Sequence, residues 1–386
     1  MHPSEAQYIQ AKKIVFLVTD TQRGGAETQI QRIASTLSHR GDQELHIIAL
    51  LSPDNDHHLF SKIPEVHFHS LNMSRGQGRP KDLIRAVRLL REIQPDVLAS
   101  FCFHANLLGA IAGRLARVPV IISSIRGERF GSPLREQIER SLDRLRLRDV
   151  VTTNSDLVAK SLIKRKITSP KRTIVIPNGI RLQDYFRESA PSSLREELSL
   201  SEDQFLWLAV GNLRSAKDYP NLLAAFEQLQ ADIQNARLII AGAFDQDEVV
   251  DELRRHPLVL RGVVQLLGPR SDIPELLEIA DAFVLSSAHE GLPNAVMEAL
   301  ATATPVVCTD VGGVRELVEP GISGFVVPPQ EPRTLSEAMA EMVLLSLEER
   351  RSMGENGKAY IEATFGLDRV VTQWDELFSA LLTAKA

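Results

Sequence analysis

The sequence predicts two α/β domains, each built on a parallel β-sheet. A chain of 386 residues is too long for one ordinary domain and fits two of about 180 residues each. Its apolar runs are short and continuous, which is typical of strands buried on both faces of a sheet. Segments with helical spacing alternate with these runs, and that alternation favours parallel sheets. We place the first domain at residues 1–185 and the second at residues 186–366.

The first half begins with a buried strand at residues 14–18, a turn at Gly24-Gly25, and a helix with apolar residues at helical spacing. The two glycines either only form the turn or let the backbone approach a ligand. Sheets of this kind bind ligands beyond the carboxyl ends of their strands, so both interpretations stay open at this point. Further strands are expected at 45–51, 66–71 (an edge strand), 95–100, 118–124, 150–154 and 173–176, with helices at 81–93, 107–115, 135–148 and 156–164.

The second half begins after residues 181–203, whose composition is that of a linker with a short charged helix. An amphipathic helix is expected at its end, over residues 367–382, around Val370, Trp374 and Leu377. Between the linker and this terminal helix, the sequence predicts strands at 205–210, 236–241, 263–267, 282–285, 305–308 and 324–327, with helices at 273–279, 295–303, 334–345 and 347–359.

The charge is unevenly distributed. Residues 1–185 carry 28 Lys and Arg against 18 Asp and Glu, a net charge of +10, whereas residues 186–386 carry 16 against 32, a net charge of −16. The basic residues gather at 126–148 and 164–172, which indicates either a solvated helix face or attraction to an anionic membrane surface. Nucleic acid is disfavoured as a partner, because no aromatic residues are interleaved with the basic ones.

The N-terminal residues lack the apolar region of a signal peptide, and no apolar run approaches the roughly 20 residues that span a bilayer. The two cysteines, Cys102 and Cys308, lie far apart and fit no metal spacing, which suits a reducing compartment. We therefore expect a cytoplasmic protein, or one bound peripherally to the inner face of a membrane.

The most informative stretch is residues 286–304, which read SSAHEGLPNAVMEALATAT. A buried strand precedes it, and a Gly-Leu-Pro turn leads into a helix, whose N-terminal amides form a natural anion site. Glu290 precedes the turn and Glu298 lies within the helix. Carboxylates beside an anion site are suited to accept hydrogen bonds from hydroxyls attached to the anion. A phosphate flanked by hydroxyl groups describes a nucleotide sugar.

This pattern, E-G-x-P-x-x-x-x-E-A, resembles the retaining glycosyltransferases of the GT4 family, which have the GT-B fold. The resemblance extends to residues 24–27, 176–180, 211–217 and 305–316, and so spans nearly the whole chain. It implies two facing Rossmann-like domains separated by a deep cleft, with the terminal helix 367–386 crossing back onto the first domain. It also implies a donor-binding second domain and an acceptor-side first domain.

The resemblance implies roles for individual residues. Glu290, His104 and Lys217 are the predicted catalytic residues: Glu290 on the hexose hydroxyls, Lys217 on the diphosphate and His104 near the reacting centre. Glu298 is expected on the ribose hydroxyls. The remaining predicted donor-binding residues are Arg214, Gly24, Gly25, Leu292, Pro293, Asn294 and Arg270. The family usually has Arg where this chain has Asn212, so Arg214 is the expected substitute.

The expected reaction transfers a hexosyl group, with retention, from a nucleoside-diphosphate sugar, expected to be a UDP-sugar. A glycan or lipid-linked acceptor in cell-surface polysaccharide synthesis is the expectation from the family. An NAD-dependent oxidoreductase is disfavoured because neither first turn contains G-x-G-x-x-G. A GT-B epimerase or phosphorylase and a non-catalytic sugar-binding protein stay open as alternatives. No cofactor or metal is expected, and Asp54-x-Asp56 with His57 and His58 is interpreted as turn chemistry.

Overall fold

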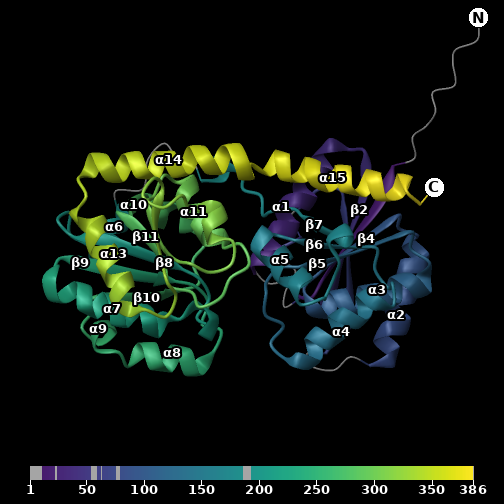
Figure 1. Cartoon of the computed structure of the whole chain (residues 1–386), viewed down its shortest axis with the longest axis horizontal. Coiled ribbons are helices and arrows are strands. Elements are labelled where there is room, and N and C mark those ends of the chain that lie inside the picture. The colour runs from purple at the N-terminus through teal and green to yellow at the C-terminus, as the bar shows by residue number, and fades with distance from the viewer. Residues whose placement is uncertain are drawn as a thin grey trace, which may run out of the picture. The chain divides into compact units, whose positions relative to one another are not determined.

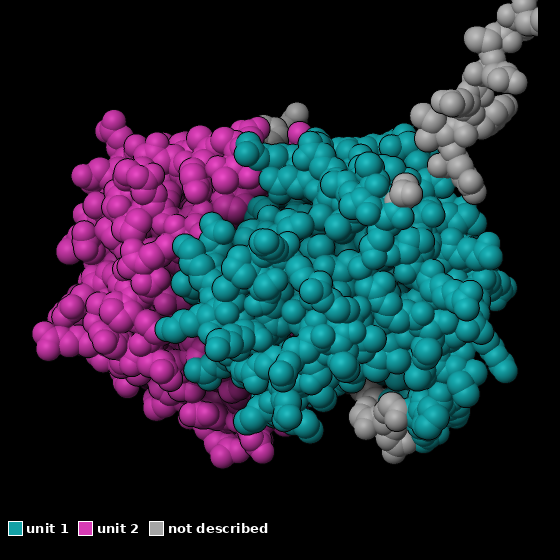
Figure 2. All heavy atoms as spheres, turned by 45° about the vertical axis from the view of Figure 1, so that its right-hand side comes forward, with its two compact units in different colours: residues 1–179, 367–386 teal, residues 180–366 magenta. Residues whose placement is uncertain are grey.

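The computed structural model describes residues 11–21, 24–53, 59–61, 63–74, 79–185 and 193–385, so the 54–58 loop lies outside the described residues. The chain forms two compact units, coloured separately in Figure 2. Unit 1 consists of residues 1–179 and 367–386, and unit 2 of residues 180–366. No helix in the described part of the chain combines the length and the apolar character needed to cross a membrane.

Unit 1 is built on a seven-stranded parallel sheet with the order β3-β2-β1-β4-β5-β6-β7 (Figure 1). Its strands are β1 (Lys12–Val18), β2 (Gln43–Leu51), β3 (Val66–Met73), β4 (Val97–Phe101), β5 (Val120–Ile125), β6 (Val150–Thr153) and β7 (Thr173–Val175). Its helices are α1 (Gly25–Arg40), α2 (Pro80–Ile93), α3 (Phe103–Ala116), α4 (Pro133–Arg144), α5 (Asp156–Lys164) and α15 (Leu367–Thr383). As predicted, β3 is an edge strand.

In strand β1, residues 14–18 are apolar at every position because both of their faces are covered. Ile14, Phe16 and Val18 point into the core beneath α1 and α15, whereas Val15 and Leu17 point into the core beneath α2 and α3. A strand covered by helices on both faces must be apolar throughout. The predicted terminal helix is confirmed as α15, whose Trp374 is fully buried in the first of these cores.

Unit 2 is built on a six-stranded parallel sheet with the order β10-β9-β8-β11-β12-β13. Its strands are β8 (Phe205–Val210), β9 (Ala236–Ala241), β10 (Val264–Gly268), β11 (Ala282–Leu285), β12 (Val306–Thr309) and β13 (Gly324–Val327). Its helices are α6 (Ser193–Glu197), α7 (Tyr219–Asp232), α8 (Asp247–Arg254), α9 (Pro257–Leu260), α10 (Ile273–Ile279), α11 (Asn294–Ala301), α12 (Val314–Leu317), α13 (Pro332–Leu344) and α14 (Leu347–Phe365).

The interpretation of residues 181–203 as a linker is wrong for the residues that the structure describes there. Tyr185, Leu194, Leu198 and Leu200 are all buried in the same core as the sheet residues of unit 2. The leucines belong to α6 and the turn after it, so this short segment closes one face of the sheet. Its many charged residues occupy the other side of a very short helix and mask the apolar pattern.

Each sheet has one point at which the strand order reverses direction. In unit 1 this switch point lies between β1 and β4, and in unit 2 it lies between β8 and β11. In doubly wound sheets, ligands bind beyond the carboxyl ends of the strands at such a point. The segments that follow these four strands are therefore the first place to search for a functional site.

Candidate functional site

The switch point of unit 2 is flanked by the segments that follow β8 and β11. After β8, residues 211–214 lead into a turn of 3₁₀ helix, Ser215–Lys217. The backbone N–H of Ala288 donates to the carbonyl of Ala216 at 2.9 Å, and the Ser286 hydroxyl donates to the carbonyl of Lys217 at 2.9 Å. These two hydrogen bonds join the segments although about 70 residues separate them in the sequence.

Lys217 and Glu290, both predicted from the sequence, form an ion pair across this junction. The Lys217 Nζ lies 2.7 Å from Glu290 Oε1, and the two side chains are 21% and 15% exposed. The hydroxyl of Ser287 donates to the same carboxylate oxygen at 2.8 Å. An ammonium group has three donors, so Lys217 can hold Glu290 and still donate to an anionic ligand.

Two glycines lie close to the place where the Lys217 side chain crosses the first segment. A Cβ on Gly211 would lie only 2.7 Å from Lys217 Cε. A Cβ on Gly242, which follows β9, would overlap the carbonyl oxygen of Gly211. That carbonyl also accepts a hydrogen bond from the buried Tyr219 hydroxyl at 2.6 Å. Burial raises the pKa of Tyr219, which keeps this hydroxyl protonated as a donor.

A third segment, after β12, fixes the backbone around Glu290. Gly312 has a φ of +54°, and a Cβ there would lie 2.6 Å from the Glu290 carbonyl oxygen. The N–H of Gly313 donates to the Gly291 carbonyl at 2.6 Å. The hydroxyl of Thr309 donates to the Ser287 carbonyl at 2.7 Å. The turn that carries Glu290 is therefore held by β12 as well as by the segment after β8.

Helix α11 begins immediately after this turn. Leu292 and Pro293 are buried, Asn294 is the first helical residue, and Pro293 at the N-cap has no side-chain capping bond. The positive end of the helix dipole therefore points toward the turn that carries Glu290. Glu298 lies one turn into the helix and is half-buried. The predicted donor residues of this stretch are thus brought together at one switch point.

The two arginines predicted to bind the donor in unit 2 both form ion pairs with carboxylates. Arg214 forms an ion pair with Asp245, and both side chains are substantially exposed. Arg270 is held by Asp272, with Nε 2.8 Å from Oδ1, and by Glu197 at 3.3 Å. The hydrogen bonds that Arg270 donates to Asp272 raise the pKa of Arg270 above its ordinary value. A phosphate would have to replace these partners before either arginine could bind it.

Asn212, which stands where a phosphate-binding arginine was expected, has a structural role. Its Oδ1 accepts a hydrogen bond from the N–H of Ala243 at 3.4 Å, next to a backbone bond from Leu213 N–H to the Ala243 carbonyl at 2.8 Å. This side chain therefore helps to join the segments after β8 and β9.

In unit 1, the segment that follows β1 at the switch point leads into the start of α1. A Cβ on Gly24 would overlap the Glu27 carboxylate, and Gly25 is the first residue of α1. Gln29, buried in the same helix, accepts a hydrogen bond from the N–H of Gly179 at 2.8 Å. Helix α1 therefore also fixes the Asn178-Gly179 turn.

Arg126, directly after β5, is a half-buried cation that is not among the predicted catalytic or donor-binding residues. It donates to Asn178 Oδ1 at 2.5 Å, and its guanidinium lies over the Phe101 ring at 5.6 Å. Burial lowers the pKa of Arg126 to about 10, an effect that the nearby Cys102 and Glu27 oppose. It therefore still carries its charge at neutral pH.

His104 is the second residue of α3 and is exposed. Partial burial of its ring, together with the positive charge of Arg135, lowers its pKa, so the imidazole is neutral at pH 7. Asn106, in the first turn of the same helix, donates to the Ser124 carbonyl at 3.1 Å and fixes α3 to β5.

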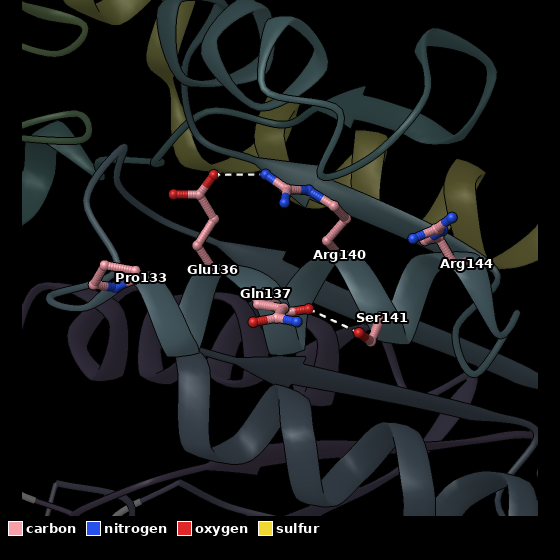
Figure 3. Close-up of a pocket in the computed structure, with 6 residues that line it drawn as sticks. All are labelled: Pro133, Glu136, Gln137, Arg140, Ser141 and Arg144. Carbon is pink, nitrogen blue, oxygen red and sulfur yellow. Dashed lines mark hydrogen bonds and ion pairs between the residues drawn. The ribbon is translucent and has the colours of Figure 1, made fainter.

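The basic stretch of unit 1 is partly neutralised by internal ion pairs. Figure 3 shows a hollow along α4 in which Arg140 points at Glu136, with 2.8 Å between Nη2 and Oε1. Glu136 also pairs with Arg165, and a hydrogen bond from Arg165 lowers the pKa of Glu136. The buried Arg148 pairs with Glu139. Fewer basic side chains of this stretch are therefore available to contact an external anion than the sequence contains, although the net charge is unchanged.

Comparison with known families decides what this architecture is. The family model described as "Glycosyl transferases group 1" matches residues 192–360, and the model described as "Glycosyltransferase Family 4" matches residues 23–184. This chain belongs to the GT4-type glycosyltransferases. The predicted family and enzyme class are thus confirmed, and unit 2 coincides closely with the group 1 match.

Named glycosyltransferases are among its relatives. The chain is 28% identical to the UDP-Gal:α-D-GlcNAc-diphosphoundecaprenol α-1,3-galactosyltransferase of Escherichia coli, over 64% of this chain and 66% of that protein. It is 24% identical to the N-acetyl-α-D-glucosaminyl L-malate synthase of Bacillus anthracis, over 93% of this chain and 94% of that protein. A capsular polysaccharide glycosyltransferase of Staphylococcus aureus, CapM, is 24% identical over 78% of this chain and 80% of that protein.

Solved structures confirm the predicted GT-B fold. Anabaena HepE in complex with UDP is 26% identical and superposes with a TM-score of 0.78, covering 95% of this chain and all of that one. HepE in complex with UDP-glucose superposes with a TM-score of 0.80 at 25% identity, over 95% of this chain and 99% of that one.

For this glycosyltransferase, the sequence motifs named the carboxylates and the lysine but missed the hydroxyl groups that hold the surrounding segments. The missed residues donate hydrogen bonds to the Glu290 carboxylate or to backbone carbonyls near it and near Lys217. They are Ser287, Thr309 and Tyr219. A hydroxyl directly after a strand at a switch point is the one signal that could have revealed Ser287.

Proposed function

We propose that this glycosyltransferase moves a hexosyl group from a UDP-sugar to a glycan or lipid-linked acceptor, with retention at the anomeric carbon, in cell-surface polysaccharide synthesis. The UDP and UDP-glucose complexes of HepE support the donor. The diphosphoundecaprenol galactosyltransferase and CapM support the acceptor class and the process. The observation that carries the proposal is the Lys217–Glu290 pair at the switch point of unit 2.

Unit 2 supplies what a nucleotide-sugar donor needs. The diphosphate would lie between the Lys217 ammonium and the N-terminus of α11, where a charge-assisted hydrogen bond and the helix dipole both favour an anion. Glu298 would accept hydrogen bonds from the ribose, and Glu290 from the hexose. Lys217 holds one oxygen of Glu290 at 2.7 Å, so the pair links the phosphate to the sugar.

The chemistry follows from this arrangement. The bond between the anomeric carbon and the diphosphate oxygen breaks, and the acceptor oxygen forms its bond on the same face of the sugar. The acceptor proton passes to a diphosphate oxygen, so the products are the glycoside and UDP. Positive charge that stabilises the departing diphosphate is the largest catalytic contribution expected, because negative charge develops there in the transition state. No protein nucleophile takes part.

Unit 1 would contribute the acceptor side of the reaction. His104 is exposed at the N-terminus of α3, and its lowered pKa makes the ring a neutral hydrogen-bonding group at pH 7. A neutral imidazole can accept a hydrogen bond from a hydroxyl, which a protonated one cannot. Gly24 and Gly25 would let the backbone at the start of α1 approach the transferred sugar.

No metal ion or organic cofactor is needed in this proposal. The countercharge for the diphosphate comes from Lys217 and α11. Arg214 would add to it after exchanging Asp245 for phosphate, which is feasible because the pair is exposed. Transfer should therefore continue in the presence of EDTA.

The first experiment identifies the donor by thermal shift. Nucleoside diphosphates and their sugars are tested as a panel, because a ligand that binds only the folded protein raises its melting temperature. UDP and one UDP-sugar should give the largest shifts. The preferred UDP-sugar is then incubated with lipid-linked and glycan acceptors, and the products are identified by mass spectrometry and NMR. A donor converted to a free epimer, or cleaved by phosphate, would replace the proposal with an epimerase or a phosphorylase.

A further inference from the structure

Three histidines and a glutamate gather on unit 1 at the opposite end of the strands from the candidate site. Glu44 and His46 lie near the amino end of β2, and His67 and His69 near the amino end of β3. The strands are parallel with His46 directly opposite His67, so alternation places all four side chains on one face. This face of β2 and β3 packs toward α2.

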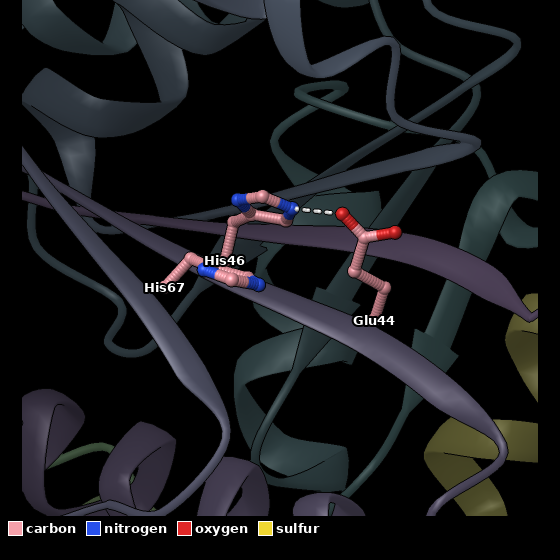
Figure 4. A group of neighbouring side chains, drawn as sticks. All are labelled: Glu44, His46 and His67. Carbon is pink, nitrogen blue, oxygen red and sulfur yellow. Dashed lines mark hydrogen bonds and ion pairs between the residues drawn. The ribbon is translucent and has the colours of Figure 1, made fainter.

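Three of these side chains offer ligand atoms close to a common point. One atom each from Glu44, His46 and His67 lies within 4.8 Å of the others, and Figure 4 shows the Glu44 carboxylate facing the His46 ring with His67 beside it. His46 Nε2 lies 3.0 Å from Glu44 Oε1. Two ligands of a tetrahedral zinc ion are separated by about 3.4 Å, given bonds of about 2.0–2.1 Å. The Glu44–His46 spacing therefore needs only a small expansion around an ion. The exposed His67 ring, which stacks on His46 with 4.8 Å between the ring centroids, would have to turn toward that ion.

The surroundings supply the supporting contacts that metal ligands require. The other oxygen of Glu44 is held by Lys13 Nζ at 3.2 Å. His46 Nδ1 lies 3.1 Å from His69 Nε2, so the ring of His46 is fixed at both nitrogens. Metal-bound histidines typically bond through the second nitrogen in this way. Because His67 is exposed, an ion can enter from solvent.

We propose that Glu44, His46 and His67 form a binding site for a divalent transition metal, with Zn²⁺ as the preferred ion. Two imidazoles and a carboxylate form one of the ligand sets that zinc takes in proteins, with water as the fourth ligand. The ion would cross-link β2 to the edge strand β3, so its effect is on the stability of unit 1. It lies away from the strand ends that carry the candidate site, and it is independent of the proposed transfer reaction.

The test is calorimetric titration of ZnCl₂ into the full-length protein, prepared without a histidine tag and stripped with EDTA. The wild type should bind one Zn²⁺, and His67→Gln and Glu44→Gln should each weaken binding by more than about tenfold. Both positions are accessible, so these variants should fold. His39→Gln removes an exposed histidine of α1 and should leave the affinity unchanged.

A second control replaces two histidines, at positions 57 and 58, that lie outside the described residues. The double variant His57→Ala/His58→Ala should bind Zn²⁺ as the wild type does. Zinc should also raise the melting temperature of the wild type but not that of His67→Gln. The proposal is overturned if the wild type binds no Zn²⁺, if both ligand variants keep the wild-type affinity, or if the loop double variant abolishes binding.

Discussion

Replacing Lys217 by Met tests the centre of the proposed site. Methionine keeps an unbranched chain that can cross Gly211, so the change removes the charge with little loss of packing. The ammonium lies 2.7 Å from Glu290, and both side chains are mostly buried. A hydrogen bond to a charged group contributes about 1.5–3 kcal/mol and an exposed ion pair less than about 1 kcal/mol. We therefore expect a loss of about 1–2 kcal/mol in the free energy of unfolding.

The effect on activity should be larger than the effect on stability. Removing one donor that stabilises developing negative charge typically lowers kcat by about 10²–10³, or about 2.7–4 kcal/mol. Lys217→Met should lower kcat/KM for the UDP-sugar by this factor, measured as UDP release at a temperature well below the melting transition. Arg333→Met is the matched control, because Arg333 is 85% exposed in unit 2 and pairs only with its helix neighbour Glu337 among the residues described.

Two outcomes would show whether a lower kcat/KM comes from a lost contact with the diphosphate or from general instability. If Lys217→Met retains kcat/KM within about threefold of the wild type, the diphosphate does not depend on this lysine and the site assignment fails. If activity falls but Arg333→Met falls equally, the loss reflects general instability. A double variant with Glu290→Gln should lose less than the sum of the two single losses, because the residues act as a unit.

Three further predictions concern stability, each measured by urea or thermal unfolding. Gly242→Ala should cost about 1–3 kcal/mol, since its Cβ would overlap a backbone carbonyl, whereas Gly127→Ala, with open space around it, should be nearly neutral. Trp374→Ala should cost about 3–5 kcal/mol because the indole is fully buried. Metal-free protein should lose stability as pH falls below 6.5, because His46 and His69 have lowered pKa values and the unfolded chain takes up protons first. Replacing both by Gln should remove that part of the pH dependence; an unchanged slope would contradict it.

Most of the fold could be predicted because local patterns in the chain agree with its global architecture. Runs such as 14–18 and 282–285 are apolar at every position because helices cover both faces of each sheet. The terminal helix was predictable from the spacing of Val370, Trp374 and Leu377, all of which are buried. The same reasoning did not reveal that α6 packs into the core of unit 2, because five residues are too few to show a helical period.

Less of the site could be predicted, because its geometry depends on contacts between distant segments. The motifs indicated Lys217 and Glu290, but the pair joins residues 73 positions apart. The support from Thr309 arises only because β12 lies beside β11 in the sheet. The ion pairs that Arg214 and Arg270 form could not be predicted either, because a sequence does not show which carboxylate lies next to a surface arginine.

The departure at Asn212 can be understood from the way the site is held. The segments after β8, β11 and β12 are joined mainly by backbone atoms, through the Ala288–Ala216 and Gly313–Gly291 hydrogen bonds. A side chain at position 212 is therefore not needed to place Lys217 or Glu290, and Asn212 is free to contact the segment after β9. Loss of one phosphate-binding arginine weakens one charge contact but leaves this framework intact. It follows that Asn212→Arg should preserve the fold and raise donor affinity if the diphosphate occupies the switch point of unit 2, whereas unchanged affinity would place the diphosphate elsewhere.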